Sequence, residues 1–124
     1  MDAGGLIHRE LSEQVIGAFY ETYNELGFGF LESVYENAFA MQLELAGFRV
    51  SRQHPIVVRF KGQKVGEFRA DLLIENVLLV EIKSVTTLLP VHEAQLLNYL
   101  KATRIQVGLL VNFGPRPLFR RRVL

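Results

Sequence analysis

Residues 68–85 are FRADLLIENVLLVEIKSV and contain two of the most apolar runs of the chain. Residues 72–74 and 77–80 have the composition of neighbouring buried strands, and Glu75-Asn76 between them is typical of a turn. The stretch therefore predicts a buried β-hairpin.

Asp71, Glu81 and Lys83 interrupt these apolar runs, although a strand could continue there with Val or Ile. Burial of an unpaired carboxylate is costly, so such groups are usually paired or bound to a metal. Glu81 and Lys83 are two residues apart, which places both on one face of a strand. An acidic pair with a lysine beside it, at the end of a hairpin, indicates a divalent-metal phosphodiesterase site.

This hypothesis makes a geometric demand on the hairpin. Asp71 and Glu81 must face the same side of the sheet, which requires a connection of odd length centred on Asn76. A three-residue loop over 75–77 satisfies this demand, whereas a two-residue turn pairs Asp71 with Val80 unless a bulge restores the phase. We predict the odd loop or a bulge.

The bulk properties bound the class of protein. The 124 residues, 49% of them hydrophobic, are expected to form a single domain over 1–124 with a real core. The absence of cysteine excludes a disulfide scaffold, a zinc–thiolate site and cysteine catalysis. No apolar run approaches the roughly 20 residues that span a bilayer. The N-terminus lacks a signal-peptide pattern, so we expect a cytoplasmic protein without a membrane partner.

Charge is balanced overall but uneven along the chain. The formal net charge is +1, yet Arg116, Arg120, Arg121 and Arg122 fall within the last nine residues. These arginines either contact a phosphate backbone or form a solvated basic tail.

Hydrophobic periodicity predicts the order of the elements. Three- and four-residue spacing indicates helices over 7–26, 31–45 and 91–103. A period of two, or a continuous apolar run, indicates strands over 48–53, 56–60, 64–75, 77–85 and 106–113. The last residues are either a short edge strand or a frayed end. The fold class is thus α/β or α+β, in the order ααββββαβ, with a mixed, mainly antiparallel sheet flanked by helices.

Five ordered blocks carry a resemblance to a known family. Residues 29–35, GFLESVY, match the GxxExxY motif that names a small bacterial protein family. The stretches RADLLIE, LLVEIKSV, HEAQLLNYLKATR and VGLLVNFG resemble the remaining blocks of that family, from about Leu6 to Arg122. The family is similar to the PD-(D/E)xK nuclease superfamily, which implies a restriction-endonuclease-like core.

The resemblance assigns roles on the hairpin. Asp71 corresponds to the acid of the first strand motif, and Glu81-Ile82-Lys83 corresponds to the ExK element. Ala70 stands where the superfamily name has proline, a departure that leaves the carboxylate in place.

The resemblance also assigns roles on the helices. Glu32 resembles the additional helix-borne acid of many such nucleases. Gln95 and Tyr99 match the QxxxY element of RecB-type nucleases, and their spacing of four places them on one helical face.

Together these features imply a metal-dependent nuclease that acts on DNA, or less often RNA. Mg²⁺, or Mn²⁺, suits an all-oxygen ligand set. Asp71, Glu81 and the carbonyl of Ile82 are the expected ligands, with Glu32 binding directly or through water. Lys83 would orient the attacking water or stabilise developing charge. Gln95 and Tyr99 would hold Lys83 or the scissile phosphate.

The proposed site residues also have purely structural interpretations when each is taken alone. Glu32 alone suits a helix N-terminus, where the macrodipole favours an acid. Glu81 and Lys83 alone could be a salt-bridged pair, and Gln95 and Tyr99 could be helix surface and core. The alternative function is a non-catalytic nucleic-acid-binding or protein-interaction module that retains the nuclease fold. The small net charge favours that alternative, or else a homodimer or a partner protein.

Overall fold

The computed structural model describes residues 8–124. Over this range the chain forms three helices, which are α2 (Arg9–Leu26), α3 (Glu32–Leu45) and α4 (Pro90–Thr103). It also forms five strands, which are β1 (Val50–Phe60), β2 (Gln63–Ile74), β3 (Leu78–Lys83), β4 (Val107–Phe113) and β5 (Pro117–Val123). Ile7, the predicted start of the first helix, lies outside the described residues.

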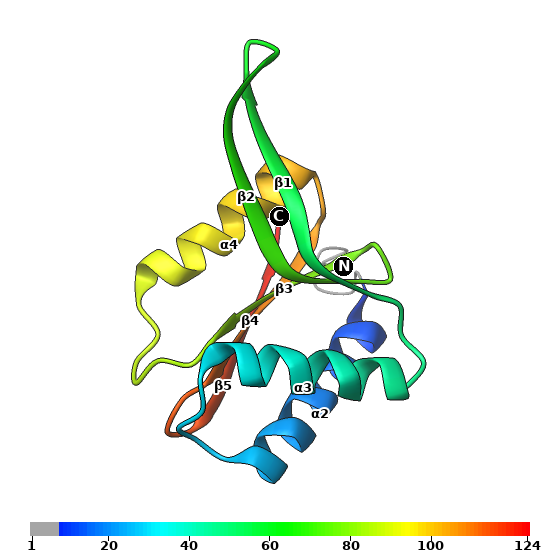
Figure 1. The fold of residues 1–124 in the computed structure, drawn as a ribbon. Helices are drawn as coiled ribbons and strands as arrows, with labels where there is room; N and C mark the ends of the chain where they lie inside the picture. The colour runs from blue at the N-terminus through cyan, green and yellow to red at the C-terminus, as the bar shows by residue number, and fades with distance from the viewer. Residues whose placement is uncertain (1–7) are drawn as a thin grey trace.

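The strands form one mixed sheet in the order β1-β2-β3-β4-β5. β3 and β4 are parallel, whereas the other neighbouring pairs are antiparallel. A parallel pair needs a long crossover connection, which α4 supplies here. The expected α+β class with a mixed, mainly antiparallel sheet is confirmed (Figure 1).

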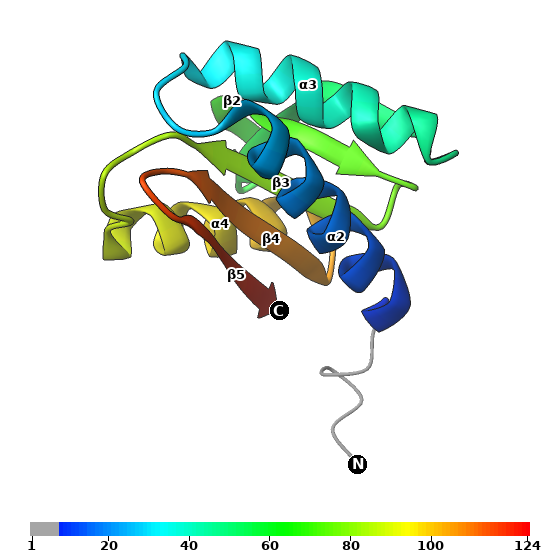
Figure 2. The ribbon, with the colours of Figure 1, turned by 90° about the horizontal axis from the view of Figure 1, so that it is seen from below.

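Helices cover both faces of the sheet. α2 and α3 lie on one face and α4 lies on the other (Figures 1 and 2). Along β3, Leu78, Val80 and Ile82 pack in the core beneath α2 and α3, whereas Leu79 packs in the core beneath α4. A strand buried on both faces has no polar side to show, which explains its continuous apolar sequence. Glu81 and Lys83 therefore belong to the α4 face, where they replace apolar core.

The first strand differs from expectation. The two short strands predicted over 48–53 and 56–60 form the single strand β1, which pairs with β2 on both sides of Gln53. Gln53 has a φ of 50°, a local irregularity that the alternation pattern does not signal. Pro55 is tolerated because β1 is an edge strand. The observed order is ααβββαββ, with one strand fewer before α4.

The C-terminal arginines lie on a strand. Residues 117–123 form β5, which pairs with β4 along its length, so the edge-strand alternative for the tail is confirmed. Arg120 and Arg122 both form ion pairs with Glu93 of α4. These pairs neutralise part of the basic cluster and tie β5 to the helix.

The distal part of the β1–β2 hairpin projects beyond the rest of the sheet and passes over α4 (Figure 1). A register shift between Val58 and Arg59 interrupts its ladder. Within residues 8–124, no helix is long and apolar enough to cross a membrane.

Candidate active site

Asp71 and Glu81 stand opposite each other across the β2–β3 hairpin. The hairpin closes on the pair of Ile74 with Leu78, so residues 75–77 form the connection. The predicted three-residue loop is confirmed, and its first two residues adopt left-handed backbone with φ of 52° and 59°. The same register, continued away from the loop, brings position 71 opposite position 81.

The backbone ladder between β2 and β3 ends at Leu72 and Val80, one residue before the carboxylates. Beyond it, the N–H of Asp71 donates to Oε2 of Glu81 (2.8 Å) and the N–H of Ile82 donates to Oδ2 of Asp71 (2.7 Å). Each carboxylate thus takes the place of a ladder carbonyl where the strands part. We call this arrangement of Asp71, Glu81 and the Ile82 N–H the carboxylate fork.

β2 changes its alternation at the fork. Ala70 packs in the core beneath α4, whereas Leu72 packs in the core beneath α2 and α3, although residues two apart normally share a face. Gln53, which has left-handed backbone, lies on β1 opposite Asp71, between the paired residues 52 and 54. At this point the Asp71 carboxylate reaches across to β3 and accepts the N–H of Ile82.

Burial makes the fork electrostatically unfavourable when both acids are ionised. Glu81 is only 4% exposed, and its burial together with the nearby charge of Asp71 raises its pKa from 4.5 to about 8. Burial also raises the pKa of Asp71, although the Ile82 N–H bond opposes this. Two crowded carboxylates in a low-dielectric setting favour a bound proton or cation between them.

Glu32 is the first residue of α3 and interacts electrostatically with Asp71 and Lys83. Burial and the charge of Asp71 raise its pKa, and the charge of Lys83 lowers it. Its position is set by the preceding loop, because the hydroxyl of Tyr35 donates to the carbonyl of Gly27 and accepts the N–H of Phe30 (3.2 Å). In this motif Gly29 lies in the loop, Glu32 supplies the acid, and the buried Tyr35 anchors the loop through its hydroxyl.

Lys83 is the cation of the site. It is half-buried on the same face of β3 as Glu81, and its charge lowers the pKa of Glu81, Asp71 and Glu32. It pairs in register with Asn112 of β4. Asn112 is buried, accepts the N–H of Val85 and donates to the Val85 carbonyl (both 2.9 Å). This pair of bonds fixes the chain just after Lys83.

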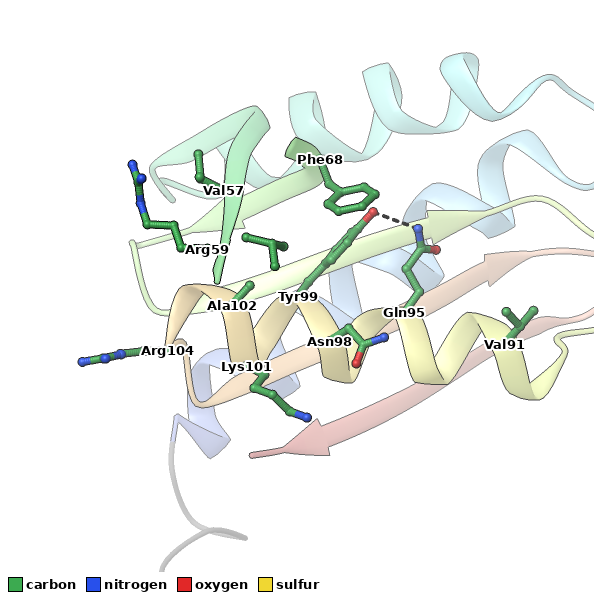
Figure 3. Close-up of a pocket in the computed structure, with 11 residues that line it drawn as sticks. Val57, Arg59, Phe68, Val91, Gln95, Asn98, Tyr99, Lys101, Ala102 and Arg104 are labelled. Carbon is green, nitrogen blue, oxygen red and sulfur yellow. Dashed lines mark hydrogen bonds between the residues drawn. The ribbon is translucent and has the colours of Figure 1, made fainter. Parts of the chain in front are cut away.

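Gln95 and Tyr99 project from α4 toward Phe68 of β2 (Figure 3). Nε2 of Gln95 donates to the hydroxyl of Tyr99 (2.8 Å), as the spacing of four predicts. Burial raises the pKa of Tyr99, and the charges of Glu81 and Asp71 add to this rise. Because Gln95 supplies the donor, the Tyr99 O–H remains available to donate to another acceptor. In the described part of the chain, neither side chain bonds to Lys83.

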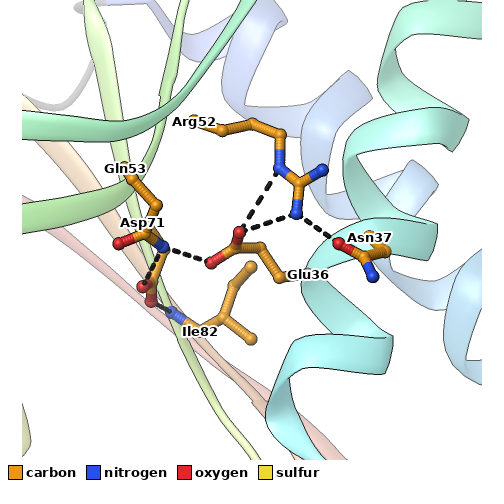
Figure 4. A network of polar contacts seen from close by, with 6 residues as sticks. All are labelled: Glu36, Asn37, Arg52, Gln53, Asp71 and Ile82. Carbon is orange, nitrogen blue, oxygen red and sulfur yellow. Dashed lines mark hydrogen bonds and ion pairs between the residues drawn. The ribbon is translucent and has the colours of Figure 1, made fainter.

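Sequence reasoning missed Glu36 and Gln53, which form a polar network with Asp71 (Figure 4). The Gln53 amide donates to Glu36 (2.6 Å) and to Oδ1 of Asp71 (3.4 Å), and Arg52 forms an ion pair with Glu36 (2.8 Å). Glu36 follows Glu32 by one helical turn, a spacing that signals a shared face. Gln53 carries no such signal, because its place depends on the irregularity in β1.

The oxygen-only donor set fits a hard divalent cation such as Mg²⁺, which binds through one or two carboxylates and retains several waters. Asp71 and Glu81 each engage one oxygen in the fork. Among residues 8–124, no group of three or more His, Asp or Glu side chains is arranged as a ligand set for one metal ion. The backbone contact of Ile82 in the fork is through its N–H.

Comparisons with known proteins bear on the fold and the family. The crystal structure of SSO0001 matches with a TM-score of 0.62 and 21% sequence identity, over 97% of this chain and 61% of that one. This likeness concerns the fold, and the chain spans about 61% of the length of that protein. No curated protein matches the chain in sequence. A family model described as the PD-(D/E)XK nuclease superfamily matches residues 9–123, and the chain belongs to that superfamily.

Proposed function

We propose that the protein is a metal-dependent nuclease that hydrolyses phosphodiester bonds of DNA at the carboxylate fork. The observation that carries the proposal is the direct opposition of Asp71 and Glu81, each bonded to the other strand where the ladder ends. Two strands with only a structural role would be expected to continue their backbone ladder here and to carry apolar side chains. Instead a buried acid, Glu81, lies against a half-buried one, Asp71, and acids with perturbed pKa values are a common sign of a functional site.

A divalent cation bound at the fork would offset the repulsion between the carboxylates of Asp71 and Glu81. Without one, the raised pKa of Glu81, about 8, keeps a proton on the pair at neutral pH. Asp71 and Glu81 would hold Mg²⁺ or Mn²⁺ directly, with the Ile82 carbonyl as a backbone ligand and Glu32 acting through water. A cation bound there would supply an acidified water and a polarised phosphate.

The neighbouring side chains have separate tasks. The Lys83 ammonium, on the same strand face as Glu81, would orient the attacking water and stabilise negative charge that develops on the phosphate. The Tyr99 hydroxyl, held by Gln95, would donate to a phosphate oxygen. The Glu36–Gln53 pair would keep Asp71 in its rotamer through the amide of Gln53.

A second candidate is a protein-interaction module that retains the fold, acting as a homodimer or with a partner protein. The observation in its favour is the apolar surface around the start of α3. Phe28, Phe30 and Leu31 are 52%, 49% and 76% exposed. Exposed apolar clusters often mark contact surfaces. This surface is compatible with a nuclease that requires dimerisation for a double-strand cut.

Cleavage of supercoiled plasmid and of single-stranded DNA, with Mn²⁺, Mg²⁺ or chelator, separates the two candidates. Metal-dependent cutting should fall by more than about 100-fold in Lys83→Ala, the loss typical of removing a transition-state donor. Lys64→Ala is the matched control, because Lys64 is exposed on the distal hairpin. If calorimetry detects no Mn²⁺ binding and no cutting occurs, the nuclease proposal fails and the interaction module is favoured.

A further inference from the structure

A cavity of about 830 Å³ lies between α4 and the distal part of the β1–β2 hairpin (Figure 3). Its volume falls within the range of about 300–1,000 Å³ that is usual for pockets enclosing groups of small-molecule size. One wall carries Phe68 and Arg59 from the hairpin, and the other carries Tyr99, Lys101 and Arg104 from α4 and its C-terminal cap. The cavity thus combines aromatic rings with cations.

This cavity lies next to the carboxylate fork at Tyr99. Gln95 and Tyr99 line it, and the charges of Glu81 and Asp71 raise the pKa of the same Tyr99 hydroxyl. A chain of linked groups that extended from the cavity toward the two carboxylates would therefore pass Tyr99.

The aromatic wall offers a ring face. Phe68 is 47% exposed, and its ring centroid lies 5.7 Å from that of Tyr99 at an interplanar angle of 38°. Gly66 lies close beneath the Phe68 ring, since a Cβ added at Gly66 would meet the ring edge at 3.2 Å. The phenyl ring is thus supported on the hairpin and remains open toward the cavity.

The rim of the cavity is positive. Arg59, Lys101 and Arg104 are all exposed, and none of them forms an ion pair with any part of the chain that the structure describes. No acidic side chain lines the cavity over residues 8–124. Three cations without counter-charges complement a ligand with repeated negative charge, such as a phosphodiester backbone.

We propose that the cavity binds an unpaired strand of nucleic acid and leads it to the fork. One base stacks on Phe68, the phosphates follow Arg59, Lys101 and Arg104, and the next phosphate reaches the Tyr99 hydroxyl. Stacking on a ring needs an exposed base face, which a continuous duplex does not offer. The proposal rests on the proposed function and specifies its substrate as single-stranded.

Binding measured in EDTA tests the proposal apart from cleavage. Fluorescence anisotropy compares a labelled single strand of DNA, the same sequence as RNA and the corresponding DNA duplex. The unpaired strands should bind more tightly than the duplex, and the difference between DNA and RNA identifies the preferred sugar. Phe68→Ala should weaken single-strand binding about tenfold or more, the usual effect of losing one stacked base. Phe68→Trp should retain it.

Phe60→Ala is the matched control, because Phe60 is 62% exposed on the same hairpin but does not line the cavity. Arg59→Ala combined with Lys101→Ala should reduce the salt dependence of single-strand binding by about 1.4 in log–log slope, about 0.7 for each phosphate contact. Tighter binding of duplex, or equal binding by Phe68→Ala and Phe60→Ala, would overturn the proposal. Metal-dependent cleavage by the same preparations would leave the nuclease proposal standing in that event.

Discussion

The Asp71 N–H donates to the Glu81 carboxylate (2.8 Å), while the Asp71 carboxylate accepts the N–H of Ile82, the residue after Glu81 (2.7 Å). This reciprocal arrangement satisfies two backbone donors that the parting strands would otherwise leave unpaired. It also holds the half-buried Asp71 against the buried Glu81. The same contacts therefore explain why the fold tolerates the acids and why they favour a cation.

The free energy of unfolding of the metal-free protein should depend on pH through Glu81. Its folded pKa of about 8 exceeds the ordinary 4.5, so between these values the folded state binds more protons than the unfolded state. Stability should therefore fall as pH rises through this window, by up to about 1.4 kcal/mol per pH unit. Denaturant unfolding in EDTA measures the slope.

Glu81→Gln removes the ionisation while an amide oxygen can still accept the Asp71 N–H. The variant should show a flatter pH dependence and should be more stable than the native protein at pH 8. Glu44→Gln, at an exposed site of α3, should retain the native slope. A native slope in Glu81→Gln would show that Glu81 is ionised throughout the window.

Metal binding should displace the proton held at the fork. The apparent affinity for Mn²⁺ should rise about tenfold per pH unit below pH 8, because binding then requires loss of one proton. Calorimetry in two buffers with different ionisation enthalpies counts the protons released. Asp71→Ala should lose Mn²⁺ binding yet remain folded, and an affinity independent of pH would contradict the assignment of Glu81 as a ligand.

Tyr99→Phe tests the hydroxyl without removing the ring. Gln95 loses its acceptor and a substrate phosphate loses a donor, so kcat should fall about 10- to 100-fold, the range expected for one hydrogen bond to a charged group. KM should change little if the hydroxyl acts mainly on the transition state. A fall in stability with unchanged kcat would assign Tyr99 to the core alone.

Asn112→Ala should destabilise the fold by about 2–3 kcal/mol, because both backbone polar groups of the half-buried Val85 lose their partner. Urea unfolding measures this loss, with Asn24→Ala on the exposed side of α2 as the control. Cleavage should fall as well, since Asn112 fixes the segment that follows Lys83. A loss below about 0.5 kcal/mol would indicate that water replaces the amide.

The sequence predicts much of the fold because its signals there are local. The parity of the hairpin around Asn76 follows from the apolar pattern and from the demand that Asp71 and Glu81 face one another. The merger of two expected strands into β1 does not follow, because Pro55 and the polar residues near Gln53 resemble a loop until β2 pairs with both halves. The role of Gln53 depends on its left-handed backbone, which only the folded sheet imposes.

The site shows the same division. Glu32, Gln95 and Tyr99 are placed by family resemblance, and the last two also by helical spacing. In the structure, charges of the fork raise the pKa of Glu32 and of Tyr99, and Gln95 bonds to Tyr99. Glu36 was within reach of the same spacing argument. The cavity beside Phe68 was not, because it depends on how the distal hairpin passes over α4.

The most direct test of the central claim is the rate of Mn²⁺-dependent cleavage of single-stranded and plasmid DNA by the native protein and by Glu81→Gln, compared with Glu44→Gln. We predict cleavage by the native protein and by Glu44→Gln, and its loss in Glu81→Gln, whose fold is retained. Cleavage by Glu81→Gln at the native rate would contradict the claim that the carboxylate fork is the active site.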